Sequence, residues 1–143
     1  MKVLCLFDSG EHVRSEERFL AESGDTKYSP LEVGGVYHVM GIIFYEKRID
    51  YLVNKKNIQP IWAPSSLFRI ESNKLPQHFS AEKINGGQYN WLAQEYGAKF
   101  IIGYPALVNS FSHFVGLQER EATDLAIFYS AFKEGYGEQE LEL

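Results

Sequence analysis

Four histidines, His12, His38, His78 and His113, are the side chains of this 143-residue chain best suited to acid–base or metal chemistry. They are widely separated, and no two have the short spacing at which a pair of histidines can hold zinc. Ser110 stands one helical turn before His113, and a Ser/His pair could perform nucleophilic catalysis. No partner carboxylate is indicated beside that pair, however. We therefore expect no catalytic residues, no metal and no cofactor, and we keep a hydrolase that uses His113 or His78 only as a third alternative.

Carboxylates outnumber cations in this chain, 19 against 14, and the net charge is −5. An acidic balance disfavours general nucleic-acid binding, which requires a basic face. A charge of this size is sufficient for solubility alone, and it also suits a basic partner. With tyrosines that we expect to be exposed, the acidic loop and helix residues are the candidate partner-binding set: Glu11, Glu16, Glu17, Tyr45, Tyr51, Glu119, Glu121 and Asp124.

Two predicted hairpin turns carry basic pairs, Lys47-Arg48 and Lys55-Lys56, and tyrosines lie nearby. Cations interleaved with aromatic rings resemble the binding faces of nucleic-acid-binding barrels. Lysines at turns also protect strand edges from pairing with other chains and need no ligand. Nucleic-acid or small-ligand binding is therefore the alternative function.

The elements that would position these residues begin with short strands in the first half of the chain. Gly41 within an apolar run predicts a bulge or a sharp bend, and Pro60 predicts an edge or an irregular point. The polar residues 9–30 read as a long loop. The apolar runs predict strands at residues 2–8, 37–45, 49–53, 58–63 and 67–70.

The second half of the chain changes to a helical pattern. Residues 88–96 predict a short helix that Gly97 would end, although a strand is the competing interpretation. The clearest helix is 119–134, which has one apolar stripe and is followed by Gly135. Between these helices we expect a strand at 99–104 and a short helix or helical loop at 106–115, and before them a polar connector at 77–87.

These elements predict one α+β domain over residues 1–143. We expect a twisted antiparallel SH3-like β-barrel at about 31–75, with C-terminal helices from about 88–135 packed against it. An acidic tail would follow at 136–143.

The single cysteine, Cys5, lies in an apolar run and excludes an internal disulfide framework. A chain without disulfides fits a reducing compartment, so we expect a cytoplasmic protein. No apolar run approaches the roughly 20 residues that span a membrane, so we expect no membrane partner.

The segment Leu31-Glu-Val-Gly-Gly-Val-Tyr-His-Val39 resembles the opening of SH3-like barrels, where a strand follows a glycine turn. A wider pattern consists of Pro60-Ile-Trp-Ala-Pro-Ser-Ser-Leu-Phe-Arg-Ile70, then Gly103-Tyr-Pro-Ala-Leu-Val108, then a helix around Ile127-Phe128. Together these segments resemble a family of small, mostly uncharacterised bacterial proteins over residues 28–134. The resemblance implies no catalytic residues.

Small acidic bacterial proteins of this type are often immunity partners of secreted toxins, including those of contact-dependent inhibition. The resemblance in size and charge therefore implies a non-enzymatic immunity protein. We expect it to mask the active site of a basic, nuclease-like toxin with carboxylates arranged around aromatic anchors.

Overall fold

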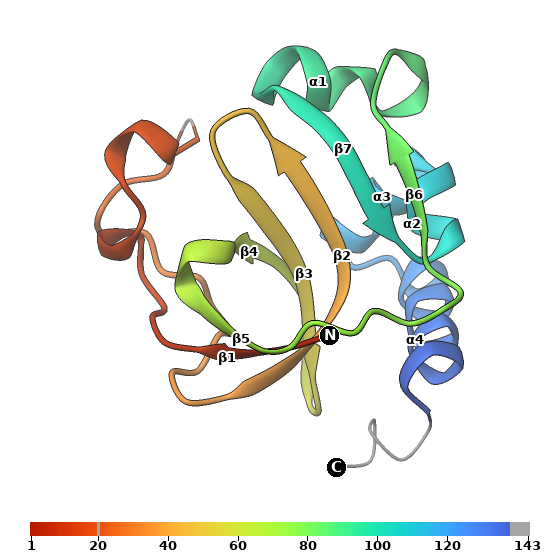
Figure 1. Cartoon of the computed structure of the whole chain (residues 1–143), viewed down its shortest axis with the longest axis horizontal. Helices are drawn as coiled ribbons and strands as arrows, with labels where there is room; N and C mark the ends of the chain where they lie inside the picture. The colour runs from red at the N-terminus through yellow and green to blue at the C-terminus, as the bar shows by residue number, and fades with distance from the viewer. Residues whose placement is uncertain (20, 138–143) are drawn as a thin grey trace.

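The computed structural model describes residues 1–19 and 21–137, which form a mixed α+β fold (Figure 1). These residues contain one antiparallel sheet of seven strands and four α-helices. The sheet is open, so the closed barrel expected at 31–75 is not found. The acidic tail expected at 136–143 falls outside the described residues from position 138 onward.

The first half of the chain supplies five strands in the order β4-β3-β2-β1-β5. All five predicted strands are confirmed, with small shifts at their ends. A single 3₁₀ turn at Ser65–Leu67 joins the fourth strand to the fifth. The bounds are β1 Lys2–Cys5, β2 Val36–Tyr45, β3 Ile49–Lys55, β4 Ile58–Pro64 and β5 Phe68–Ser72.

The second half adds two strands and the helices. Strand β7 pairs with the later part of β2, and β6 pairs with the other side of β7. The polar connector predicted at 77–87 is therefore wrong in part, because it contains β6. The bounds are β6 Ser80–Lys83, α1 Asn90–Tyr96, β7 Ala98–Gly103, α2 Pro105–Asn109, α3 Phe111–Gln118 and α4 Ala122–Tyr136.

Three helix boundaries test the sequence predictions. Gly97 ends α1 in the left-handed conformation, with φ of 73°, as expected. Gly135 does not end α4 but lies inside it, where an added Cβ would come within 2.9 Å of His78. The helix predicted at 106–115 is divided at Ser110, whose extended backbone and side-chain oxygen begin α3 by accepting the His113 N–H at 3.1 Å.

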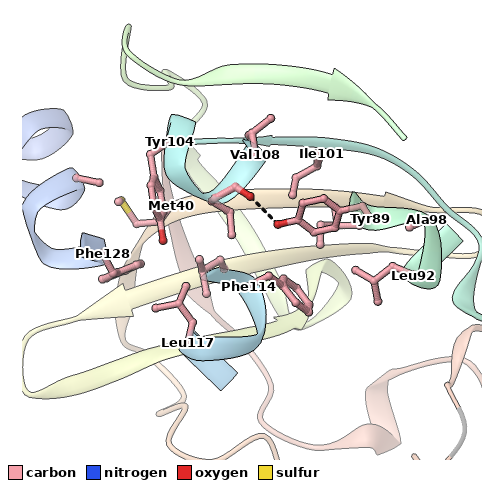
Figure 2. Packing of buried hydrophobic residues seen from close by; sticks show 14 of the residues in the cluster. Met40, Tyr89, Leu92, Ala98, Ile101, Tyr104, Val108, Phe114, Leu117 and Phe128 are labelled. Atoms are coloured by element: carbon pink, nitrogen blue, oxygen red, sulfur yellow. Dashed lines mark hydrogen bonds between the residues drawn. The ribbon is translucent and has the colours of Figure 1, made fainter. Parts of the chain in front are cut away.

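Strand β2 separates two hydrophobic cores, because both of its faces are buried. Met40 and Ile43 point to the core shared with the helices, which Figure 2 shows. Tyr37 and Val39 point to the second core, which contains β1 and β5 residues. The pairing register with β3 shifts between Val39 and Gly41, which confirms the predicted bulge. Even-numbered Met40 faces the first core before the bulge, whereas odd-numbered Ile43 faces it afterwards.

The backbones of β2 and β7 approach closely where Gly41 pairs with Gly103. A Cβ at Gly41 would lie 2.6 Å from Leu107 Cδ2 and 3.2 Å from Trp62, and a Cβ at Gly103 would lie 2.8 Å from the same Leu107 atom. The absence of both side chains therefore allows α2 to pack its Leu107 directly on the sheet.

Substitution of Gly41→Ala is expected to lower the free energy of unfolding by about 1–3 kcal/mol, because Leu107 and Trp62 must move. Urea denaturation measures this change. Gly24→Ala is the matched control, since its added Cβ meets only Arg18 Nη2 at 3.5 Å. Equal stability of the two variants would contradict the close approach.

Candidate functional site

The predicted acidic residues occupy two separate segments. Glu11 and Glu16 are exposed on the N-terminal segment, and Glu119 and Glu121 are exposed between α3 and α4. Figure 1 draws the N-terminal segment and α4 on opposite sides of the molecule. Glu17 is half-buried and accepts a hydrogen bond from Arg14 at 3.1 Å.

The two tyrosines expected as exposed anchors are not exposed. Tyr51 is 8% exposed and packs in the second core, with its ring centroid 6.0 Å from that of Phe68. Its position in the middle of β3, between β2 and β4, explains this burial. Tyr45 is half-buried and lines a cavity, which is described below.

Asp124 was expected among the partner-binding residues, but its carboxylate bonds to a buried histidine. His113 Nδ1 donates to Asp124 Oδ1 at 2.8 Å, and the Tyr104 hydroxyl donates to His113 Nε2 at 2.6 Å. We assign these donors because a carboxylate only accepts, which places the ring proton on Nδ1. Burial raises the pKa of Tyr104, so its hydroxyl retains the proton that it donates.

The burial of this hydrogen-bonded chain and the contacts of its members favour a structural role between helices over a catalytic one. His113 is 4% exposed and both of its ring nitrogens have partners. Ser110, the residue that a Ser/His dyad would use, accepts a hydrogen bond from the His113 backbone N–H and not from the ring. A Cβ on Gly116 would lie 1.9 Å from Asp124 Oδ2, so that glycine allows the carboxylate to reach across from α4.

The four basic turn residues do not form the expected patch. Lys47 and Lys56 are exposed, and Lys55 pairs with Glu32 at 3.1 Å. The side chain of Arg48 is only 7% exposed and points into the protein. One of the four cations proposed for nucleic-acid binding therefore has an internal role.

Arg48 is the centre of a buried ion cluster with Glu22 and Asp50. Its Nη1 donates to Glu22 Oε1 at 2.5 Å, its Nη2 donates to Asp50 Oδ2 at 3.1 Å, and its Nε lies 2.8 Å from Asp50 Oδ1. The guanidinium carbon also lies 3.6 Å from the centroid of the Phe19 ring, a cation–π contact. These contacts hold the N-terminal segment against the β2–β3 hairpin.

The pKa values of the two carboxylates in this cluster shift in opposite directions. Loss of water raises the pKa of Asp50 to about 6, despite the neighbouring Arg48. Burial alone would also raise the pKa of Glu22, but hydrogen bonds from Tyr28, Arg48 and the Phe19 N–H outweigh it and lower that pKa. Desolvation thus determines the direction of the pKa shift of Asp50 but not that of Glu22.

The ion cluster forms one side of a cavity of about 320 Å³, which we call the aromatic pocket. Residues from the N-terminal segment, β2, β3, β4, α1 and α3 line it, so no single part of the sequence specifies it. Gln118 and Leu92 complete the lining. Its six aromatic residues are Phe19, Tyr45, Trp62, Trp91, Tyr96 and Phe114, and its three charged residues are Glu22, Arg48 and Asp50.

The aromatic rings support one another around this pocket. The Phe19 centroid lies 4.8 Å from that of Tyr45 and 5.1 Å from that of Tyr96, and Trp91 lies 5.6 Å from Tyr96. Trp91 is nonetheless 53% exposed, so about half of its surface is available to a ligand. Such edge and tilted contacts hold the rings in place before any ligand arrives.

Sequence reasoning had not selected Asp50, Phe19 or Trp91. One signal was available for the ion cluster: Asp50 interrupts an apolar strand, and residues two apart, such as Arg48 and Asp50, share one face of a strand. No local signal marks Phe19 or Trp91, because their proximity to the cluster is decided by long-range packing.

Comparison with known proteins identifies no relative of this chain: no family model, no curated protein and no solved structure matches it. Among the described residues, no helix combines the length and apolar character needed to cross a membrane. The same part of the chain contains no group of three or more His, Cys, Asp or Glu side chains placed to hold a metal ion.

Asp50→Asn is expected to change how stability depends on pH. The folded state holds the Asp50 proton more tightly than the unfolded chain, whose pKa is 3.8, so this group's contribution to stability falls as pH rises from about 4 to about 6. The wild type should therefore lose on the order of 3 kcal/mol relative to Asp50→Asn across this window.

Urea denaturation at several pH values measures this difference, and Asp25→Asn, at an exposed position, is the control. Glu22 acts in the opposite direction at lower pH, since its lowered pKa makes stability fall on acidification. Parallel pH profiles for wild type and Asp50→Asn would refute the assignment.

Proposed function

We propose that the protein is a non-enzymatic binding protein whose ligand site is the aromatic pocket. The main observation in support is that six aromatic residues and a buried ion cluster line one cavity of about 320 Å³. Small-molecule sites are concave, mostly apolar and provided with a few placed polar groups, and their volumes begin at about 300 Å³. A larger cavity of about 450 Å³ beside Lys47 and Glu95 has mainly polar and charged walls, so apolar groups form a smaller share of its surface than in the aromatic pocket.

The residue types of the pocket also support recognition. Tryptophan and tyrosine are enriched among residues that dominate binding energy, because they bury much area and lose little conformational freedom. Trp91 is the most exposed of the aromatic residues that line the pocket, and the Tyr96 ring packs against it in an edge contact.

The proposed fold type is an SH3-like arrangement of residues 1–72. The strand order β4-β3-β2-β1-β5, in which β1 lies between β2 and β5, supports it. So does the 3₁₀ turn between β4 and β5. A fold of this type accommodates many functions, so the proposal for function depends on the pocket alone.

Trp91→Ala is expected to weaken the binding of aromatic fragments roughly 10-fold, because it removes the exposed ring of the pocket. Ligand-observed NMR with a fragment library measures binding to the wild type and to the variant. Val33→Ala is the control, because Val33 is also well exposed, at 60%, and lies outside the pocket lining. A library without a single Trp91-dependent fragment would reject the pocket as the ligand site.

A cytoplasmic immunity protein that masks a basic, nuclease-like toxin is the second candidate. The net charge of −5 and the exposed carboxylates on two segments favour it, since complementary charge accelerates association. Copurification with the product of the neighbouring gene tests it. Two charge-reversal pairs, Glu11→Lys with Glu16→Lys and Glu119→Lys with Glu121→Lys, would show which segment contacts the partner.

If one segment forms the interface, charge reversal in that segment should lower the association rate with the partner. Charge reversal in the other segment should leave that rate unchanged. Failure to copurify, together with failure of the protein to rescue growth in the presence of the toxin, would reject this candidate.

A further inference from the structure

The charges of the side chains that line the aromatic pocket do not sum to zero. The pocket lining contains two carboxylates, Glu22 and Asp50, and one guanidinium, Arg48, which leaves one negative charge when both carboxyls are ionised. The faces of aromatic rings carry the negative part of the ring quadrupole. Both features favour a positively charged ligand and disfavour an anion.

The protein already provides an internal example of this preference. The Arg48 guanidinium lies 3.6 Å from the centroid of Phe19, and the Phe19 ring is in turn supported by Tyr45 and Tyr96. One cation thus occupies an aromatic face beside the carboxylates. The exposed surface of Trp91 offers a second position of the same kind.

The hydrogen bonds of the cluster decide which kind of cation fits. Glu22 already accepts from Tyr28, Arg48 and the Phe19 N–H, and both Asp50 oxygens face Arg48. A primary ammonium brings three N–H donors. The Glu22 oxygens and Asp50 Oδ2 already accept hydrogen bonds, and Asp50 Oδ1 makes none but is buried within 2.8 Å of Arg48 Nε. A quaternary ammonium brings no donor and needs only ring faces and a nearby negative charge.

We propose that the aromatic pocket binds a small quaternary ammonium compound, with the methylated head against Trp91 and its neighbouring rings and the ion cluster as the counter-charge. This inference rests on the pocket being the ligand site, as proposed above, and specifies the chemical class of its ligand.

Titration of Asp50 gives the proposal a pH signature. The groups that face Asp50 are Arg48 on the same hairpin, Glu22 and Tyr28 from the N-terminal segment, and Tyr45 from β2. Burial raises the pKa values of Tyr28 and Tyr45, so these tyrosines stay neutral, and Asp50 changes charge at a pKa of about 6. Affinity for a cation should therefore decline as the pH falls through this value.

The test is isothermal titration calorimetry of the full chain with choline and with the neutral isostere of choline in which carbon replaces nitrogen. At about pH 8 we expect choline to bind roughly 10-fold more tightly than the isostere, and at about pH 5 this preference should shrink. Trp91→Ala should weaken choline binding roughly 10-fold, and Val33→Ala should leave it unchanged.

Equal binding of choline and the isostere would overturn the cation assignment, as would no binding of choline by a protein that still takes Trp91-dependent fragments. Both outcomes leave the proposed function in place. The absence of any Trp91-dependent ligand, fragment or cation, would overturn both proposals. Because Trp91 is largely exposed, its substitution keeps the test independent of folding, unlike a change at Asp50.

Discussion

The whole structure depends on the double burial of strand β2. This strand pairs with β3 along one edge, while along its other edge it pairs first with β1 and then with β7. Gly41 and Gly103 are needed where β2 meets β7, because a side chain at either position would displace Leu107, which packs there from α2. The two cores lie on opposite faces of β2, and the neighbouring strand β3 also contributes to both, through Leu52 and Val53.

The second organising interaction is the burial of Arg48 between two carboxylates and an aromatic ring. A buried guanidinium is costly unless it is paired and hydrogen-bonded. Here Glu22, Asp50 and Phe19 contact it from two parts of the chain, and both of its Nη atoms donate hydrogen bonds, whereas Nε lies in ion-pair contact only. The long N-terminal segment consequently packs on the β2–β3 hairpin and becomes a wall of the aromatic pocket. The contacts of Arg48 with Glu22, Asp50 and Phe19 thus position one wall of the pocket.

A separate polar network organises the helices. The chain from Tyr104 through His113 to Asp124 joins α3 to α4 and to the end of β7, and Gly116 leaves space for the carboxylate. Fully satisfied buried networks of this kind specify one packing arrangement, since any shift leaves a buried polar atom without its partner. Ser110 and His113, the pair in the sequence that could have performed catalysis, thus stabilise the arrangement of the helices.

The sequence by itself determined where six of the seven strands and most helices lie, including the bulge at Gly41 and the end of α1 at Gly97, because these depend on neighbouring residues. It also indicated a mixed α+β fold and an acidic protein. Only the tertiary structure decided that the sheet stays open, that Tyr51, Asp124 and Arg48 turn inward, and that Phe19 meets Trp91 around one cavity. Local sequence carries propensity and periodicity, whereas strand pairing, burial and charge compensation depend on residues brought together from distant positions.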